Sequence, residues 1–446
     1  MSTTPAPPTI RHRLSQVTPV QWLIVAGIFH LVFTLLIFLI GYFRLWPSVF
    51  DQYGIGIGFA LDGAVYRWWI PEISDLLWYR GFSAWYALQA PLHCRLYSLV
   101  FIFPGCLVGY NILAAEPLNL IYYLAILVFV YRLAKELFDS CTGLIAAGIV
   151  AVWPSLLIHT TQLVRDSFSI ALMLALTWIL VMVLQRKPSW RYGLKMGFAG
   201  VVIVIIFWLT RGNFWNIVIA ELLLTLFLLI IRIVRERKLL ATNFLVVVLV
   251  FGAVLIVPTL VESTTIAGTP PAIAVITIPN RNDSKSKTLL SRLVAQIRSR
   301  RAGFSVYGAQ ASNVDSNVKF YDAGDIARYL PRALAVGMFA PFPGMWFESG
   351  KSGLAGRLLA GAEMLVMYLL YGLALVCLWR ERKRPPVWLL TLVAVTGFLA
   401  LGLVVVNAGA LFRLRYVFWV LVIVLASETI KRVCVNTTSQ SVLPNQ

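Results

Sequence analysis

The chain has 446 residues, of which 59% are hydrophobic and 13% charged, and its mean hydropathy is +0.81. Ordinary soluble domains are about 45–50% apolar and about 25% charged, so this composition excludes a soluble globular protein and indicates a polytopic membrane protein. The formal net charge of +19 is typical of membrane proteins, which collect Lys and Arg in cytoplasmic loops. We therefore expect no nucleic-acid partner.

The first apolar run covers residues 21–41 and follows a polar, Pro-rich segment, residues 1–20. The run is too long for the hydrophobic region of a signal peptide, and no small-residue cleavage site follows it. We expect the run to be a membrane anchor and residues 1–20 to be a cytoplasmic tail.

Clusters of Lys and Arg separate the later apolar runs. They are Arg11 and Arg13, 131–138, 185–195, 232–238, 380–386 and Lys431–Arg432. If all of them face the cytoplasm, ten spans follow, each close to the ~20 residues that cross about 30 Å of hydrocarbon. These are 21–43, 117–134, 142–160, 167–184, 196–211, 214–231, 243–261, 358–379, 387–406 and 414–430. The sequence thus predicts an all-α polytopic membrane protein with a second cytoplasmic tail, 431–446.

Two further apolar stretches, 96–115 and 329–347, contain both Pro and Gly. Counting either as a full crossing reverses the sidedness of every basic cluster after it. We expect them to be re-entrant or interfacial helices on the outer side, where broken backbone is tolerated if protein covers it.

Two long outer loops lie between these spans. The first, 44–116, belongs to a transmembrane module of residues 21–261, and the second, 262–357, precedes C-terminal transmembrane helices at 358–430. Loops of this length are uncommon unless they are functional, so we expect chemistry or binding on the outer face. We interpret the basic stretch 281–301 as a solvated segment, although it would also attract an anionic glycan, lipid or phosphate.

Charged residues recur at the outer ends of the predicted spans. Arg165 and Asp166 lie between the third and fourth spans, Arg211 ends the fifth, and Arg413 and Arg415 follow the ninth. Asp166 suits a helix N-terminus. Arginines on the outer side oppose the usual charge bias. They indicate either an anionic ligand, because the guanidinium group matches phosphate oxygens, or pairing with nearby acids and lipid headgroups.

The first outer loop is rich in aromatic residues, which favours helices lying in the membrane interface. Within this loop Asp62 and Tyr66 are four residues apart and would share one face of a helix. The five cysteines and four histidines of the chain are too dispersed to predict a metal site.

The order and sidedness of these features resemble the GT-C superfamily of membrane glycosyltransferases, especially the protein O-mannosyltransferase and lipid A aminoarabinose transferase branch. The motifs that carry the resemblance are PLHCRLYS (91–98), the stretch from PLNLIYY to LVRDSF (117–168), LTRGNF (209–214) and FRLRYVFWVLVIVLAS (412–427). The resemblance covers residues 20–230 and 360–430. It implies a GT-C-like arrangement of the transmembrane helices.

GT-C enzymes move a sugar from a polyprenyl-phosphate donor to an acceptor on the outer side. The resemblance implies that Asp62 is the general base, with Asp51 as the alternative acid because it lies closer to the first span. Asp166 would orient the acceptor or the sugar, or hold a divalent cation together with Asp62. No other cofactor is implied.

The resemblance also implies the residues that bind the substrate, which are Arg165, Arg211, Arg413, Arg415, Tyr66 and His93. The arginines would neutralise the departing phosphate. The implied partners are a polyprenyl-phosphate-linked sugar donor, a lipid, glycan or protein acceptor, and the surrounding membrane lipids. A bacterial inner membrane is the expected location.

Three other functions stay open on the sequence. One is an O-antigen polymerase or ligase, in which Arg and His carry the chemistry and 281–301, Arg328 or Arg332 would be central. The second is a transporter or flippase for an anionic lipid-linked substrate. The third is a non-enzymatic scaffold.

Overall fold

The computed structural model describes residues 18–47, 50–51, 53–57, 61–88, 90–238, 240–265, 289–306, 312–348 and 353–440. The helices are α2 (Pro19–Tyr42), α3 (Leu61–Ala87), α4 (Leu92–Ile102), α5 (Pro104–Val108), α6 (Ile112–Leu137), α7 (Ser140–Ala151), α8 (Pro154–Thr160), α9 (Asp166–Gln185), α10 (Trp190–Arg211), α11 (Trp215–Glu236), α12 (Ala241–Thr265), α14 (Leu289–Val306), α15 (Ala323–Phe339), α16 (Gly353–Arg380), α17 (Pro385–Val404), α18 (Ala408–Leu414) and α19 (Tyr416–Gln440). Two 3-10 turns, η1 (Gly212–Phe214) and η4 (Pro343–Met345), complete the elements. The predicted all-α architecture is confirmed.

Seven helical segments in the described part of the chain are long and apolar enough to cross a membrane, or up to nine if each of two bent helix pairs is one span. One of the seven, Trp190–Glu236, has 47 residues and comprises α10, η1 and α11. A straight helix of that length would extend about 70 Å. However, a Cβ at Gly193 would touch Thr242 and a Cβ at Gly200 would touch Val250.

These contacts show that α10 and α12 run parallel, with their starts side by side. Helix α11, which joins them in sequence, must therefore return along the bundle, and Trp190–Glu236 supplies two candidate spans. With this segment divided and each bent pair taken as one span, the described residues contain ten candidate spans, the number that the sequence predicts.

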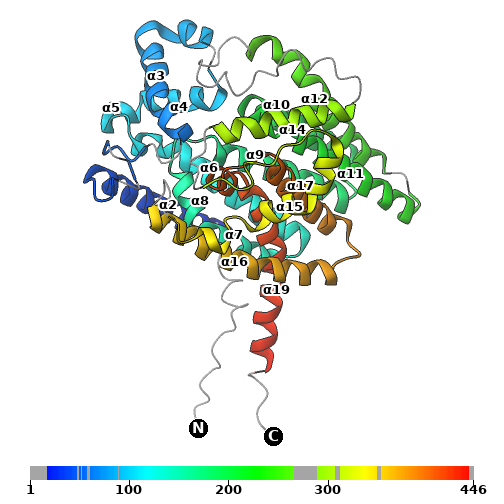
Figure 1. The fold of residues 1–446 in the computed structure, drawn as a ribbon. Helices are drawn as coiled ribbons and strands as arrows, with labels where there is room; N and C mark the ends of the chain where they lie inside the picture. The colour runs from blue at the N-terminus through cyan, green and yellow to red at the C-terminus, as the bar shows by residue number, and fades with distance from the viewer. Residues whose placement is uncertain are drawn as a thin grey trace, which may run out of the picture.

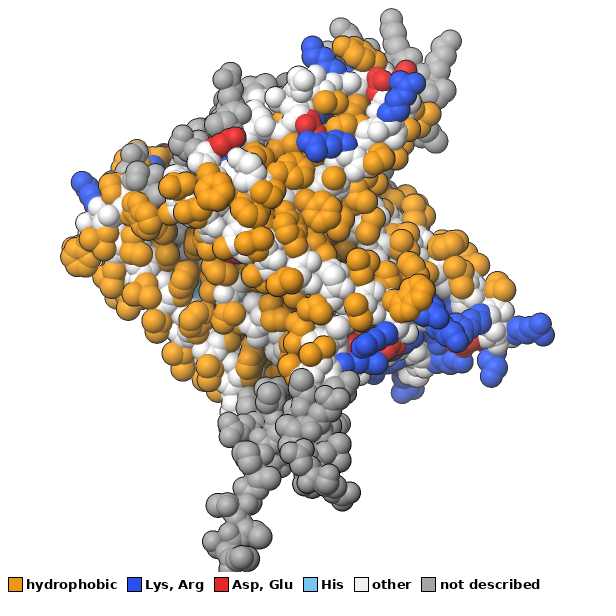
Figure 2. All heavy atoms as spheres, turned by 60° about the horizontal axis from the view of Figure 1, so that its bottom comes forward, with side chains coloured by type: hydrophobic (Ala, Val, Ile, Leu, Met, Phe, Trp, Pro, Cys, Tyr) orange, Lys and Arg blue, Asp and Glu red, His pale blue; other side chains and the backbone are white. Residues whose placement is uncertain are grey.

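The helices pack into one bundle with a largely apolar outer surface. In Figure 1, α2 lies at one side of the bundle, α11 at the other, and α9 between them. In the most apolar stretch of α9, 83% of the residues are buried, whereas in that of α2 only 28% are buried. Hydrophobic side chains cover the middle of the face in Figure 2, and Lys and Arg gather towards its edges. This is the surface expected of a bundle surrounded by lipid.

Two of the crossings are broken, and buried charged side chains close both breaks. Helices α7 and α8 are bent by 70°, and α18 and α19 by 54°. At the first break, Glu363 of α16 accepts hydrogen bonds from Ser155 N (2.7 Å) and Oγ (2.5 Å) and from Trp153 Nε1 (3.0 Å). At the second, Arg415 donates to the Gly337 carbonyl oxygen at the end of α15 (3.2 Å). The backbone N–H of Ser155 at the first break thus finds a partner inside the protein, and Arg415 at the second break supplies a partner to the end of α15.

The end of the bundle where α9 begins and α10 ends is here called the outer end, following the predicted sidedness. The predicted helix 329–347 instead covers 323–339, because Asp322 caps it: Asp322 Oδ1 accepts a hydrogen bond from Asp325 N at 2.9 Å. Likewise, the predicted 96–115 stretch ends early, since Asn111 Oδ1 accepts from Leu113 N (2.8 Å) and starts α6.

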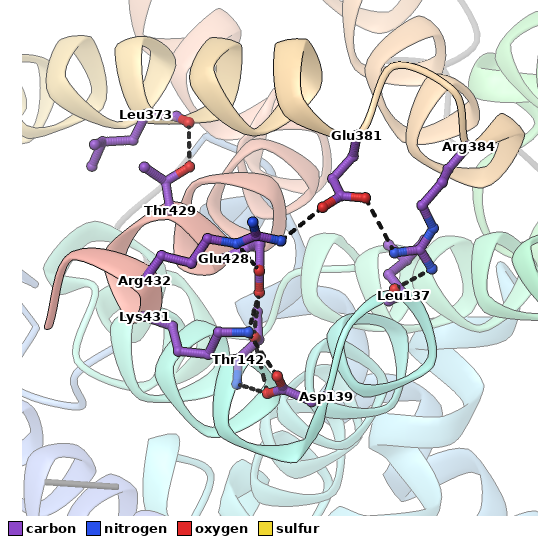
Figure 3. Close-up of polar contacts among 10 residues, drawn as sticks. All are labelled: Leu137, Asp139, Thr142, Leu373, Glu381, Arg384, Glu428, Thr429, Lys431 and Arg432. Carbon is purple, nitrogen blue, oxygen red and sulfur yellow. Dashed lines mark hydrogen bonds and ion pairs between the residues drawn. The ribbon is translucent and has the colours of Figure 1, made fainter. Parts of the chain in front are cut away.

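A network of ion pairs joins several helices at the opposite, inner end (Figure 3). Glu428 of α19 binds Lys431 (2.6 Å) and Arg432 (2.5 Å), and it accepts a hydrogen bond from the Thr142 hydroxyl of α7 at 2.9 Å. Arg432 also pairs with Glu381, which follows α16, at 2.7 Å. The basic clusters 380–386 and Lys431–Arg432 therefore share one end of the bundle.

Helix α15 packs unusually close to α17, and this contact gives a first prediction. A Cβ at Gly402 would lie 1.8 Å from the Ala333 carbonyl oxygen, so Gly402→Ala must push the two helices apart. We expect the substitution to destabilise the fold by about 1–3 kcal/mol, measured as a lower Tm in detergent. Gly372→Ala in α16 is the matched control, because nothing lies within 4 Å of its added Cβ. Equal losses of Tm in both variants would contradict the close packing.

Candidate active site

A buried ion cluster lies at the outer end, centred on Asp166. Asp166 is 2% exposed in the first turn of α9. Arg211, the last residue of α10, donates a hydrogen bond from Nη1 to Asp166 Oδ1. Arg413 of α18 brings Nε to 3.3 Å from Asp166 Oδ2. Asp166 therefore binds guanidinium groups from two other helices instead of only capping its own.

The chain breaks on both sides of this cluster for local reasons. Arg211 has φ −150° and ψ 59°, outside the helical region, and this ends α10 at the start of η1. Arg413 stands on the short helix α18, whose first turn is capped by Asn407: its Oδ1 accepts from Ala410 N at 3.0 Å. These breaks let two arginines from distant parts of the chain meet one carboxylate.

A small pocket adjoins the cluster. Its lining residues are Asp166, Ser169, Ile170, Met173, Phe207, Arg211, Phe214, Arg413, Leu414 and Val417. The charged groups meet at one side, and aliphatic and aromatic side chains form the rest. A charged group attached to an apolar chain would suit such a lining.

The first outer loop approaches the same region through α4. Tyr66 of α3 is buried and its ring meets that of His93 edge-on, with the centroids 4.7 Å apart. Burial, and then the positive charge of Arg165, hold the pKa of His93 well below its ordinary value, while Asp166 acts in the opposite sense. His93 is therefore close to the ion cluster and neutral near pH 7. Asp62 lies on α3 one turn before Tyr66, but its side chain is outside the described residues.

Asp51 and Arg415 have other partners. Asp51 is buried and accepts hydrogen bonds from Tyr53 N (3.0 Å), Ile55 N (2.8 Å) and Arg67 Nη1 (3.3 Å), so it organises its own loop. Arg415 is fully buried over the ring of Trp419, 4.1 Å from the centroid. Neither lines the pocket.

The described side chains offer no ready set of ligands for a divalent cation. The described side chains contain no group of three or more His, Cys, Asp or Glu that would hold a metal ion. Both oxygens of Asp166 already face guanidinium groups. The described residues therefore do not fit a divalent cation at Asp166.

The second outer loop contributes two arginines of the basic stretch 281–301. Arg300 of α14 donates to the Asn213 carbonyl oxygen of η1 at 3.1 Å, so α14 lies beside the turn that follows Arg211. Arg301 is 4% exposed and donates to the Leu403 carbonyl oxygen at 2.9 Å. The interpretation of 281–301 as solvated is thus wrong for Arg301. Residues 281–288 lie outside the described part.

Comparison with known proteins supports the sequence interpretation over part of the chain. Residues 96–261 match the family described as dolichyl-phosphate-mannose-protein mannosyltransferase. This confirms the predicted resemblance to protein mannosyltransferases there. The matched segment includes Arg165, Asp166 and Arg211, but neither the first-loop acids nor Arg413. No curated protein matches the chain.

Several solved structures are similar in outline. ArnT from Cupriavidus metallidurans bound to undecaprenyl phosphate has 13% identity and a TM-score of 0.46, with 93% of this chain and 61% of that chain covered. The apo oligosaccharyltransferase of Archaeoglobus fulgidus has 14% identity and a TM-score of 0.47, with 94% and 52% covered. AglB from Archaeoglobus fulgidus, in complex with an inhibitory peptide and a dolichol-phosphate, has 14% identity and a TM-score of 0.45, with 94% and 52% covered. The chain thus spans less than two thirds of each of these proteins.

The ion cluster predicts a non-additive pair of substitutions. Asp166→Asn leaves the buried Arg211 and the half-buried Arg413 without their carboxylate, which we expect to cost about 3–5 kcal/mol. Adding Arg211→Gln removes one uncompensated charge, so the double variant should be more stable than Asp166→Asn alone. Thermal unfolding in detergent measures both, with Glu72→Gln, an exposed acid of α3, as the control. Simple addition of the two losses would contradict a shared buried cluster.

The lowered pKa of His93 predicts a specific sensitivity to acid. In the unfolded chain the pKa of a histidine is about 6.5, whereas the pKa of His93 in the folded protein is lower. The stabilisation is therefore complete above about pH 6.5 and is lost progressively as the pH falls below that value. We expect Tm to fall between pH 8 and pH 5 by less in His93→Gln than in the wild type. Identical pH profiles would show that His93 does not titrate this way.

Proposed function

We propose that the protein is a GT-C-type glycosyltransferase of a bacterial inner membrane, with both termini cytoplasmic. It transfers a sugar from a polyprenyl-phosphate donor to a lipid, glycan or protein acceptor at the outer, periplasmic end. The observation that carries the proposal is the Asp166–Arg211–Arg413 cluster beside a pocket with apolar walls. The family match over residues 96–261 supports it.

The charge of the cluster suits a phosphate. Arg165, Arg211 and Arg413 supply three guanidinium groups, so cations outnumber carboxylates even if Asp62 joins Asp166. Guanidinium groups bind phosphate oxygens through paired, charge-assisted hydrogen bonds. In a water-poor site such fixed donors stabilise the negative charge that develops on a departing phosphate. Asp166 then orients Arg211 and Arg413 towards the leaving group.

The apolar part of the pocket suits the lipid. Ile170 and Met173 of α9 line it together with Leu414 and Val417. A polyprenyl chain would bury its hydrocarbon here, while the attached phosphate reaches the arginines. Burial of apolar surface is worth about 25 cal/mol per Å², so the polyprenyl chain contributes to the binding of the donor.

In the transfer step, Asp62 removes the proton of the acceptor hydroxyl as the oxygen attacks the anomeric carbon. The new carbon–oxygen bond forms while the bond to the phosphate oxygen breaks, and the electron pair leaves with the phosphate. This single displacement inverts the anomeric carbon. The position of Asp62 one turn before Tyr66, which contacts His93 near Asp166, supports this role.

A transporter for an anionic lipid-linked substrate is the second candidate. The two broken crossings, α7/α8 and α18/α19, favour it, because broken helices often line the substrate sites of transporters. A transporter would bind the same phosphate without cleaving the bond to the sugar. Binding and turnover therefore have to be measured together.

The test uses the full chain in lipid nanodiscs with undecaprenyl phosphate and its glycosylated forms. Arg413→Gln should weaken the binding of undecaprenyl phosphate by about 10- to 100-fold, since it removes a charge-assisted hydrogen bond. Asp62→Asn should leave binding intact and slow sugar transfer by about 10²- to 10⁴-fold. Arg328→Gln, an exposed basic residue of α15, is the matched control.

The possible failures of this test are distinct. Equal binding by Arg413→Gln and Arg328→Gln would exclude the phosphate site. Binding and translocation by the wild type without transfer would favour the transporter. Full activity in Asp62→Asn would exclude Asp62 as the base.

A further inference from the structure

A second group of buried polar side chains lies next to the ion cluster, and its hydrogen-bonding capacity is not satisfied. The atoms without a hydrogen-bond partner among the described residues are His93 Nδ1, Asn119 Nδ2, Tyr122 OH and Gln162 Oε1. Their side chains are buried, with exposures of 0%, 0%, 4% and 2%. Buried polar atoms of this kind are rare in folded proteins and call for a partner.

The four residues lie around Tyr97 of α4. The Tyr97 hydroxyl donates to Asn119 Oδ1 at 2.6 Å and lies 3.4 Å from the Gln162 carbonyl oxygen. His93 is one helical turn before Tyr97, and Tyr122 presents its ring edge-on to that of Tyr97 with centroids 6.3 Å apart. Facing sides of α4 and α6, with the turn after α8, therefore bring these four residues into one polar region.

This polar group adjoins the proposed phosphate site. Gln162 is three residues before Arg165, and the charges of Arg165 and Asp166 both act on His93. A sugar attached to a phosphate held by Arg211 and Arg413 would have to occupy space beside the cluster. The polar group, whose members Asn119 and Tyr122 lie in the outer half of α6, is adjacent to that space.

The chemistry of the unpartnered atoms matches hydroxyl groups. The Asn119 amide nitrogen donates, the Gln162 amide oxygen accepts, and the Tyr122 hydroxyl does both. Which of these His93 Nδ1 does depends on its tautomer. A sugar hydroxyl donates one hydrogen bond and accepts others, so a hydroxyl-rich ring can pair with this mixture. A hydrocarbon would leave every one of these atoms unpaired.

We propose that His93, Asn119, Tyr122 and Gln162 form the subsite for the neutral, hydroxyl-rich sugar ring of the lipid-linked donor. The proposal rests on the proposed function, because the phosphate at Arg211 and Arg413 places the sugar. Without the donor, buried water would pair with these atoms. The donor sugar replaces that water and supplies the missing hydrogen bonds.

Tyr122 and the adjacent Tyr123 allow a matched test. Tyr122→Phe removes only a hydroxyl that lacks a partner, whereas Tyr123→Phe removes one that donates to the Ala151 carbonyl oxygen at 3.0 Å. We expect Tyr122→Phe to keep or raise Tm, and Tyr123→Phe to lower it. A gain in stability combined with a loss of sugar binding would distinguish a binding group from a structural one.

Binding is measured on the full chain in nanodiscs with undecaprenyl phosphate and with undecaprenyl-phosphate-linked mannose, glucose and galactose. We expect the wild type to bind at least one glycosylated lipid more tightly than undecaprenyl phosphate. Tyr122→Phe should weaken that binding by about 3- to 10-fold and leave undecaprenyl phosphate unaffected. Gln162→Met should act in the same direction, and Tyr123→Phe should not alter the preference.

Several outcomes would overturn the subsite. One is an unchanged preference in Tyr122→Phe and Gln162→Met, which means that the atoms bind water only. Equal weakening of all lipids means a structural role, and no preference for any glycosylated lipid excludes a sugar subsite for these donors. Tyr122-dependent binding of methyl mannoside alone would assign the atoms to an acceptor sugar. If undecaprenyl phosphate itself does not bind, the proposed function fails first and the subsite fails with it.

Discussion

Every polar backbone group inside the membrane must find its partner within the protein, and the two broken crossings of this fold depend on that requirement. Glu363 satisfies the freed groups at Trp153 and Ser155. Arg415 binds a carbonyl oxygen at the end of α15. At the first break a buried carboxylate from another helix offsets part of the lost helical hydrogen bonding. At the second break Arg415 lies in the bend itself and binds the end of the neighbouring helix α15.

The two breaks also position residues of the candidate site. Helix α8 ends at Thr160, and the turn that follows delivers Arg165 and Asp166 to the outer end. The bend between α18 and α19 leaves Arg413 facing that carboxylate. Straight helices would place these groups at separate points on the rim. The first break thus precedes Asp166 and the second follows Arg413, and the two residues form an ion pair between them.

The sequence predicts the parts of this fold that follow from local pattern. Apolar runs and basic clusters predicted the crossings. The arginines noted at the outer ends of those crossings include Arg211 and Arg413, which pair with Asp166. The sequence did not show that Arg413 and Arg415 have different roles. Arg413 lies on α18 and Arg415 lies in the bend that follows, and the two side chains have different partners, which tertiary packing decides. Asn119 and Tyr122 were missed because polar residues within an apolar run do not reveal what they face.

The second outer loop belongs to the site, because it fixes the start of α18. Val314 N donates to the Val406 carbonyl oxygen at 2.8 Å, and Asn313 forms an isolated bridge with Asn407. Asn407 is also the residue that caps α18, the helix that carries Arg413. Arg301 ties the same loop segment to the end of α17 through the Asp315 and Leu403 carbonyl oxygens. A shift in this loop would therefore move Arg413 relative to Asp166 without touching either residue, so the loop acts on the site through the position of a single guanidinium group.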